Sequence, residues 1–329
     1  MSIDGNVAGH EAGEGRIDAV LTQIRLAARG INLYTFERTD GGQLPAAEPG
    51  AHIGLHLPNG LNRQYSLVVS DASPTSYTVG VKKDEASRGA SRWIHEHLRV
   101  GAVVPLDLPR NNFALDEATG GKSILIAGGI GITPLYCMMH RLAALGQEHE
   151  LHYSSRTRDQ AAFLRELSVN PAAYLYFSDE MAGERMPIDR IIAQAPAGTH
   201  FYCCGPSSML EAFEAACAVA GCPAETIHVE YFTPRYETAT EGGFDVELKR
   251  SGLKLAVPAG KSILQVLLDA GIDVPHSCDM GICGTCETRV LEGTPDHRDS
   301  LLSDTERAES KTMMICCSGA KSAKLVLDL

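Results

Sequence analysis

The sequence has no long hydrophobic run, although 44% of its 329 residues are apolar. A membrane-spanning helix needs about 20 consecutive apolar residues, so the pattern excludes one. Residues 1–15 have neither a basic start nor an apolar block, so no secretory signal is predicted and we expect a disordered tail there. Basic residues are also in deficit, and the net charge of −12 argues against nucleic acids and anionic membranes as partners.

Cysteine, in contrast, is abundant, with ten residues. In a chain without a secretory signal this number indicates a reducing, cytoplasmic setting. Thiols in that setting bind metals or pack in cores rather than form disulfides. The length is sufficient for two or three domains, each with its own buried core.

Three of the cysteines lie in one short stretch, Cys278-Asp-Met-Gly-Ile-Cys283-Gly-Thr-Cys286, and two more follow at the adjacent positions Cys316 and Cys317. An x4 gap, an x2 gap and a distant fourth cysteine form the plant-type ferredoxin spacing, in which four thiolates bind a [2Fe–2S] cluster. The spacing therefore predicts an iron–sulfur cluster in this loop.

Two other uses of these cysteines fit the sequence less well. A four-cysteine zinc site usually repeats a C-x2-C pair, and only one such pair, Cys283 with Cys286, is present here. A disulfide framework needs an oxidising compartment. Gly281 and Gly284 favour the cluster, because a loop that wraps closely around it needs residues that tolerate positive φ.

Residues 16–112 are predicted to form a closed antiparallel β-barrel, because short strand patterns alternate with turn signals. One helix is expected at Ser91–Leu98, with Ser91 as its N-cap. The predicted strands are Ile17–Ala27, Leu33–Arg38, His52–Leu57, Gln64–Ser70, Tyr77–Lys83 and Val103–Leu108.

Two motifs of this region combine groups that bind a phosphate. Arg63-Gln64-Tyr65-Ser66 offers a guanidinium, a ring and a hydroxyl, and Arg88-Gly89-Ala90-Ser91 opens the predicted helix after Lys82-Lys83. An arginine, a hydroxyl and a helix N-terminus together favour an anion, and a neighbouring tyrosine can cover an aromatic ring. Taken singly, each residue is also typical of a solvated charge or an ordinary cap.

Residues 113–232 change period, since apolar strands alternate with helices, and this predicts a doubly wound parallel sheet. The strands lack polar alternation, as expected for burial on both faces. The predicted strands are Ile124–Ala127, Leu151–Ser154, Tyr174–Phe177, Phe201–Cys204 and Thr226–Val229. The predicted helices are Pro134–Leu145, Gln160–Leu167, Ile188–Gln194 and Ser208–Ala220.

The first of these strands ends in a glycine-rich turn, Gly128-Gly129-Ile130-Gly131-Ile132-Thr133-Pro134. We expect Thr133 to cap the next helix, Pro134 to be its first residue and Gly146 to end it. Such glycines let a pyrophosphate approach the backbone at a helix N-terminus. The pattern departs from the usual G-x-G-x-x-G, because Pro134 stands in place of the third glycine.

A polar linker is predicted at residues 233–242, followed by an α+β unit of the β-grasp type over residues 243–329. Its helix, Ser262–Ala270, has a capping box of Ser262 and Gln265 and ends at Gly271. Ile263, Leu264, Leu267 and Leu268 form the apolar face of this helix. The predicted strands are Phe244–Lys249, Lys254–Val257, Thr288–Leu291 and Leu325–Leu329.

These motifs, in this order, resemble the phthalate dioxygenase reductase branch of the ferredoxin-reductase-like family. Arg-x-Tyr-Ser and the Gly-x-Ser turn resemble its flavin barrel. Gly-Gly-Ile-Gly-Ile-Thr-Pro with a later Cys204-Gly205-Pro206 resembles its NAD(P) domain, and the cysteine loop resembles its ferredoxin. The resemblance covers essentially the whole chain and implies a flavin β-barrel, a doubly wound nucleotide domain and a β-grasp ferredoxin.

The resemblance also assigns residues to cofactors. It implies FMN, although the sequence itself does not exclude FAD, and it selects Cys316 as the fourth cluster ligand, leaving Cys317 as a packed thiol. The flavin residues implied are Arg63, Gln64, Tyr65, Ser66, Val81, Lys82, Lys83, Arg88, Gly89, Ala90 and Ser91. The nucleotide residues implied are Gly128, Gly129, Ile130, Gly131, Ile132, Thr133, Pro134, Ser155, Arg156, Cys204, Gly205 and Pro206.

NADH is favoured over NADPH by the resemblance, because this branch is mostly NADH-dependent. Arg156 favours a 2′-phosphate, whereas Asp179 and Glu180 suit a ribose diol. Cys204 is implied beside the nicotinamide as a positioning residue, although its sequence alone indicates a buried strand thiol. Phe232 is implied to shield the isoalloxazine, and an ordinary packing role fits it equally well.

The implied activity is electron transfer from NADH through FMN, and then one electron at a time through the cluster, to a Rieske-type aromatic oxygenase or O-demethylase. Because the cofactors supply the chemistry, no side-chain acid, base or nucleophile is predicted. Two rival functions stay open. One is a reductase for another acceptor, such as a cytochrome P450, and the other is a redox-sensing protein without turnover.

Overall fold

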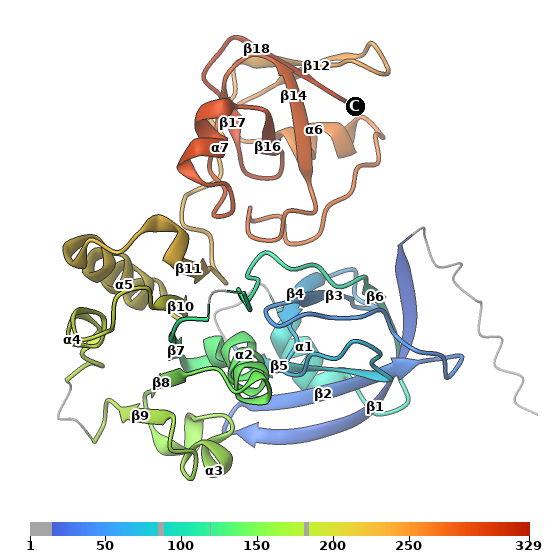
Figure 1. Ribbon diagram of the computed structural model, residues 1–329. Helices are drawn as coiled ribbons and strands as arrows, with labels where there is room; N and C mark the ends of the chain where they lie inside the picture. The colour runs from blue at the N-terminus through green and yellow to red at the C-terminus, as the bar shows by residue number, and fades with distance from the viewer. Residues whose placement is uncertain (1–14, 85–88, 119, 181–183) are drawn as a thin grey trace, which may run out of the picture.

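The computed structural model describes residues 15–84, 89–118, 120–180 and 184–329, which fold into three units (Figure 1). We call them the barrel, the parallel-sheet unit and the C-terminal unit, in chain order. The disordered tail predicted at residues 1–15 lies outside the described residues except for Gly15, and so does Arg88.

The barrel is a six-stranded antiparallel sheet with the order β4-β3-β6-β1-β2-β5. Its edge strands approach each other, because Leu67 bridges Val79 and the Val68 N–H donates to the Thr78 carbonyl at 3.0 Å. This closure confirms the predicted barrel. The strands are β1 Arg16–Ala28, β2 Ile31–Arg38, β3 His52–His56, β4 Asn62–Ser66, β5 Ser76–Lys82 and β6 Val103–Asp107.

The barrel helix α1, Ala90–His97, packs Ile94 into the barrel core. It begins one residue earlier than predicted, so the expectation that Ser91 is its N-cap is wrong. Gly89 occupies the cap with φ 100° and provides no side-chain cap. Only glycine adopts this left-handed geometry readily, so the chain turns at Gly89 and places Ser91 inside the first helical turn.

The parallel-sheet unit has five parallel strands in the order β11-β10-β7-β8-β9. Helices α2 and α3 pack on one face and α4 and α5 on the other, which confirms the doubly wound fold. The strands are β7 Ser123–Gly128, β8 His149–Ser155, β9 Ala173–Phe177, β10 His200–Cys204 and β11 Ile227–Glu230. The helices are α2 Ile132–Leu145, α3 Leu164–Leu167, α4 Ile188–Ala193 and α5 Ser207–Ala220.

Two helix starts in this unit differ from prediction. A 3₁₀ turn at Gly129–Gly131 runs directly into α2, so Thr133 lies inside the helix and donates from Oγ1 to the Ile130 carbonyl at 3.0 Å. The predicted roles of Thr133 as N-cap and Pro134 as first residue are therefore wrong. The helix predicted at Gln160–Leu167 is reduced to α3, after a 3₁₀ turn at Arg158–Gln160.

The C-terminal unit is a mixed sheet with the order β13-β12-β18-β14-β16, crossed by α6, as a β-grasp fold requires. The capping box of α6 is confirmed, whereas Leu268 is 39% exposed and does not join the buried face. The segment between β14 and β18 contains α7 Asp304–Glu309, strand β16 and the small β15–β17 pair, none of which was predicted. The other elements are β12 Phe244–Leu248, β13 Lys254–Val257, α6 Ile263–Asp269, β14 Glu287–Glu292, β15 Pro295–Asp296, β16 Thr312–Met314, β17 Gly319–Ala320 and β18 Lys324–Leu327.

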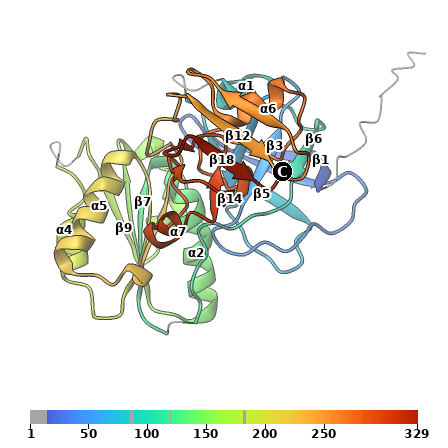
Figure 2. The ribbon, with the colours of Figure 1, turned by 90° about the horizontal axis from the view of Figure 1, so that it is seen from above.

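The C-terminal unit stands on the other two, with its loops directed towards them (Figure 1). Seen from above, it overlies the barrel and the neighbouring side of the parallel-sheet unit (Figure 2). No helix among the described residues combines the length and the apolar character needed to cross a membrane.

Candidate functional site

Four cysteine thiols converge inside the C-terminal unit. Their residues are almost fully buried, with exposed fractions of 2% for Cys278 and Cys283, 5% for Cys286 and 4% for Cys316. The thiol of Cys278 interacts with those of Cys283 and Cys316, and these neighbours lower the pKa of Cys278. The thiol of Cys316 interacts with those of Cys278, Cys286 and Cys317, which raise the pKa of Cys316.

The cysteine loop, residues 277–286, needs an unusual backbone. Asp279, Gly281 and Gly284 all have left-handed φ values, 55°, 70° and 75°. A Cβ added to Gly281 would collide with the Cys317 sulfur. The prediction that this loop depends on glycine at these positions agrees with its geometry, since glycine alone avoids both the strain and the collision.

The adjacent cysteines differ in their contacts. The Cys317 thiol lies 3.7 Å from the Met314 carbonyl oxygen and packs against Gly281, whereas the Cys316 thiol interacts with Cys278 and Cys286 as well as with Cys317. This arrangement supports the assignment of Cys316 to the ligand set and of Cys317 to packing.

The donor set fits a [2Fe–2S] cluster, because the converging side chains are four thiols. The described residues contain no group of three or more His, Cys, Asp or Glu side chains arranged for a metal ion. A two-iron cluster is a larger ligand, since each iron takes two thiolates, and the paired contacts of the four cysteines suit it.

A cavity of about 540 Å³ lies where the three units meet. One wall comes from β4, β5 and the start of α1, and a second comes from the glycine-rich turn and the segment after β11. Cys278, Met280 and Ile282 of the cysteine loop supply the third wall. A predicted cluster ligand therefore lines the same cavity as the predicted flavin residues. We call this space the junction cavity.

Most of the residues predicted for the flavin line the junction cavity. Val81 does not, because its side chain is buried in the barrel core, and the Lys83 ammonium lies 2.9 Å from a Glu96 carboxylate oxygen instead. Gly89 stands at the N-cap of α1 without lining the cavity. The predicted residues in the cavity walls are Arg63, Gln64, Tyr65, Ser66, Lys82, Ala90, Ser91, Ile130, Thr133 and Phe232.

Glu230 also lines the junction cavity, and the sequence did not single it out. Its Oε2 accepts hydrogen bonds from Ser66 Oγ at 3.5 Å and from Cys204 Sγ at 3.8 Å. Burial raises the pKa of Glu230 to about 8, so the carboxyl group keeps its proton at neutral pH. Its strand-end position, next to Tyr231 and Phe232, was visible in the sequence, but its enclosure by two units was not.

Cys204, at the end of β10, is fully buried, and burial raises the pKa of its thiol well above the ordinary value. A buried thiol with a raised pKa is a poor nucleophile, which agrees with a positioning role. Its bond to Glu230 places it behind the junction cavity rather than in its wall.

The glycine-rich turn packs against the loop after β10. A Cβ on Gly131 would collide with the Cys204 carbonyl oxygen, and a Cβ on Gly128 would lie 2.6 Å from Pro206 Cδ. Gly205 is equally crowded, because its Cβ would lie 2.8 Å from Met209 Sδ. Gly129 differs, since it has φ 55° and open space around it. Of these glycines, Gly129 alone has free space beside its backbone for a pyrophosphate.

The ends of β8 and β9 carry the residues predicted for the adenosine. Ser155 Oγ donates to the Thr157 carbonyl at 2.6 Å, and the Asp179 N–H donates to the Arg156 carbonyl at 3.2 Å. Glu180 binds both Nε and Nη2 of Arg158, at 2.5 and 2.8 Å. The Arg158 guanidinium also lies 4.4 Å from the centre of the Phe177 ring.

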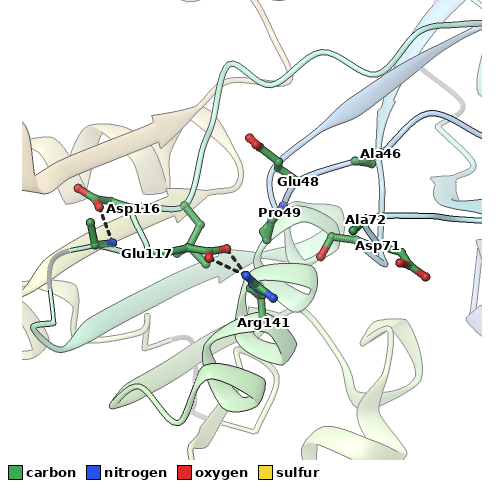
Figure 3. Close-up of a pocket in the computed structure, with 12 residues that line it drawn as sticks. Ala46, Glu48, Pro49, Asp71, Ala72, Asp116, Glu117 and Arg141 are labelled. Atoms are coloured by element: carbon green, nitrogen blue, oxygen red, sulfur yellow. Dashed lines mark hydrogen bonds and ion pairs between the residues drawn. The ribbon is translucent and has the colours of Figure 1, made fainter.

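A second cavity, also of about 540 Å³, opens between barrel loops and α2 (Figure 3). Arg141 of α2 donates two hydrogen bonds to Glu117, at 2.8 and 2.7 Å, so its charge is neutralised. The wall holds none of the residues predicted for a cofactor. Its other charged members are the exposed acids Glu48 and Asp71 and the partly buried Asp116.

Comparisons with known proteins agree with this division into sites. The 2Fe-2S iron-sulfur cluster binding domain family matches residues 246–321, and the oxidoreductase NAD-binding domain family matches residues 125–215. The phenoxybenzoate dioxygenase subunit beta of Ectopseudomonas oleovorans is 49% identical over 321 residues, which are 97% of this chain and 96% of that protein.

Two solved structures share the whole arrangement. Phthalate dioxygenase reductase, described as a modular structure for electron transfer from pyridine nucleotides to [2Fe–2S], is 34% identical with a TM-score of 0.72. The match covers 96% of this chain and 98% of that one. An intact type IV self-sufficient cytochrome P450 monooxygenase is 39% identical with a TM-score of 0.86, and the match covers 98% of this chain and 43% of that one.

Proposed function

This chain belongs to the phthalate dioxygenase reductase family, and from that premise we propose that it is the reductase component of a Rieske-type oxygenase system. It passes electrons from NADH through FMN and a [2Fe–2S] cluster to the oxygenase. The observation that carries the proposal is the junction cavity, in which Cys278 of the cysteine loop faces Arg63 and Tyr65 of the barrel.

The junction cavity suits a flavin phosphate ester. The guanidinium of Arg63 and the ammonium of Lys82 offer positive charge, and Ser91 offers a hydroxyl in the first turn of α1. Tyr65 and Phe232 supply aromatic faces in the same cavity. Its volume, about 540 Å³, lies within the usual range for cofactor sites.

A bound FMN would supply the change from a two-electron donor, NADH, to a one-electron acceptor, the cluster. The chain positions and insulates these events. Phe232 and Tyr65 line the cavity against water, and the protonated carboxyl of Glu230 adds no charge beside it. Cys278, Cys283, Cys286 and Cys316 would hold the cluster, with Cys278 on the side that faces the flavin cavity.

The finer assignments belong to the same proposal. We assign the nucleotide to the turn at Gly129, which has open space, and to the ends of β8 and β9, whose polar side chains suit a ribose. We propose domain limits at residues 16–112, 113–232 and 243–329, and the matched ranges 125–215 and 246–321 lie inside the second and the third. A cytoplasmic location is supported by the cysteines, which form no disulfide in the described part of the chain.

An anaerobic absorption titration with NADH tests the proposal. We expect the flavin absorbance and the broad iron–sulfur bands to bleach together, because the two sites share one cavity wall. Flavin bleaching with unchanged iron–sulfur bands would reduce the assignment to a flavin–NADH enzyme. Absence of flavin absorbance from the purified protein would contradict the barrel assignment itself.

A cytochrome P450 is the second candidate acceptor. The similarity to a self-sufficient P450 monooxygenase spans 98% of this chain, so a module of this fold also occurs in a P450 protein. The two candidates separate in a reconstitution with purified partners. Turnover with a Rieske oxygenase and not with a P450 supports the first, and the reverse result supports the second.

A further inference from the structure

The C-terminal unit contacts the rest of the molecule through polar bonds at its cluster end. Gln64 on β4 donates from Nε2 to Ser277 Oγ at 2.6 Å. Asn112, in the segment after β6, donates from Nδ2 to the Cys283 carbonyl at 3.1 Å. The backbone N–H of Arg235, in the segment after β11, donates to Ser300 Oγ at 3.1 Å.

Two of these three bonds reach the cysteine loop itself, and the third reaches it through Ser300. Ser277 immediately precedes Cys278, and Cys283 belongs to the proposed ligand set. Ser300 is joined to the loop by a backbone bond, since its N–H donates to the Gly281 carbonyl at 2.9 Å. A displacement of Gln64 or Asn112 therefore acts on the loop directly, and a displacement of Arg235 acts on it through Ser300.

Ser300 is presented on a fixed turn. Asp299 is fully buried, and its Oδ2 accepts from the N–H groups of Leu301 and Leu302 at 3.0 and 2.8 Å. Arg307 donates from Nη2 to the Asp299 carbonyl at 2.6 Å. These bonds fix the segment that receives the Arg235 N–H.

Arg235 is fixed in turn to the parallel-sheet unit. Its Nη1 donates to Glu214 on α5 at 3.0 Å and to the Tyr231 hydroxyl at 3.1 Å. Its guanidinium lies 5.7 Å from the centre of the Tyr236 ring, and that of Arg307 lies 5.3 Å from the same ring. The linker thus connects α5 to the cluster end of the C-terminal unit.

We propose that Gln64, Asn112 and Arg235 are positioning residues that seat the cysteine loop against the junction cavity for electron transfer. The proposal rests on the proposed function, because it concerns the step between flavin and cluster. Electron tunnelling falls steeply with distance, and bonds from three separate segments restrain both the separation and the rotation of the C-terminal unit. Hydride transfer from NADH occurs within the other two units and does not use this seat.

The test is a double variant, Asn112→Ala with Ser300→Ala, mixed anaerobically with NADH in a stopped-flow spectrometer. We expect flavin reduction at the wild-type rate and cluster reduction about tenfold slower. Tenfold corresponds to the loss of two hydrogen bonds whose effect is partly offset by the remaining Gln64–Ser277 bond. The electron paramagnetic resonance spectrum of the chemically reduced cluster stays unchanged. NADH turnover with ferricyanide, which accepts electrons from the flavin, also stays unchanged, with the same KM.

Ser322→Ala is the matched control, because Ser322 Oγ accepts the Thr294 N–H at 2.9 Å within the C-terminal unit. It should reduce its cluster at the wild-type rate. A second pair, Arg235→Ala and Arg235→Lys, tests the linker, and we expect the lysine variant to recover part of the rate because it retains a donor for Glu214.

Three results would overturn the seat. The first is cluster reduction at the wild-type rate in both the double variant and Arg235→Ala. The second is flavin reduction that slows in these variants as much as cluster reduction does. The third is loss of the cluster from both variants, which would show a purely structural role. Failure of the proposed function looks different, since wild-type protein itself would then leave its cluster oxidised after NADH reduces the flavin.

Discussion

The cysteine loop and the glycine-rich turn both place glycines beside a predicted cofactor, yet they use them differently. In the cysteine loop, Gly281 and Gly284 adopt left-handed backbone so that the chain can wrap inward. In the turn, Gly128 and Gly131 lack side chains because another loop of the protein occupies the space. Both glycines of the cysteine loop have positive φ, and Gly281 is crowded as well, whereas Gly128 and Gly131 of the turn are required by packing alone.

The difference follows from what fixes each spacing. Four thiolates must meet one small rigid cluster, so ligand chemistry dictates the x4–x2 gaps. A dinucleotide needs only a helix N-terminus and room beside it. Most of the glycines in the pattern are therefore required by close packing against Cys204 and Pro206. A motif can therefore identify a nucleotide site without each of its residues touching the nucleotide.

The largest effect is expected when a cluster ligand in the cysteine loop is replaced. Cys283→Ser should abolish the iron–sulfur absorbance and the NADH-driven reduction of cytochrome c, because one iron then lacks one of its two thiolate ligands. Ferricyanide reduction from the flavin should persist. Cys317→Ser is the control, since its thiol faces Met314, and it should retain the cluster. A cluster that survives Cys283→Ser but not Cys317→Ser would put Cys317 in the ligand set in place of Cys283.

The next effect concerns Glu230, at the end of β11, which lines the junction cavity. Its pKa is raised by burial from 4.5 to about 8, so the native state retains a proton that the unfolded state releases across that window. The contribution of this group to the free energy of unfolding is complete below about pH 4.5. It falls by on the order of a few kcal/mol as the pH rises towards 8, and it stays constant above that.

Glu230→Gln removes this titration. We expect a flatter dependence of the thermal midpoint on pH between 5 and 9, with the variant gaining on wild type as pH rises. Differential scanning calorimetry of both proteins across this range measures the difference. Parallel curves would show that the carboxyl is ionised in the native state and that its burial has no electrostatic consequence.

A smaller effect sharpens the contrast between the glycines of the turn. Gly131→Ala should cost about 1–3 kcal/mol, because its methyl group collides with backbone that cannot move freely. Gly129→Ala should cost about 1 kcal/mol, since only its positive φ opposes a side chain. Urea denaturation compares the two variants. Equal losses would mean that the backbone around Gly131 yields to the added methyl group, since Gly131 has φ −61° and carries no strain of its own.

The smallest effect concerns nucleotide choice. Glu180 neutralises Arg158 with two hydrogen bonds, so Glu180→Gln should free the guanidinium for a 2′-phosphate. We expect the ratio of kcat/KM for NADPH to that for NADH to rise about tenfold, as for one charge-assisted contact. Arg158→Ala in the same background should remove the gain. An unchanged ratio would place the 2′ position away from Arg158.

Most of the fold was predictable because periods of apolar residues mark its elements. Errors occurred where tertiary geometry displaced a local signal. The 3₁₀ turn before α2 moved the helix start upstream of Thr133, and a glycine cap did the same before Ser91. Helix α7 was missed although Ser303 and Glu306 form a capping box, a pattern that the sequence displays.

The sites divide in the same way. Three cluster cysteines, Cys278, Cys283 and Cys286, follow from spacing within one loop, whereas the choice of Cys316 over Cys317 needed the family resemblance. Glu230 and Asn112 were missed because their roles arise only when separate units meet, and neither carries a local pattern. Val81 and Lys83 were included by proximity in sequence, yet strand alternation and an ion pair direct them elsewhere.

A single segment, between β11 and β12, covalently joins the C-terminal unit to the other two. Transfer from flavin to cluster is therefore a first-order process, whose rate is set by an effective concentration and does not change on dilution. Delivery to a separate acceptor protein is second-order. As the protein and its acceptor are diluted at constant excess NADH, the cluster should accumulate in its reduced form. Electron transfer from the flavin continues at the same rate, whereas transfer to the acceptor protein slows.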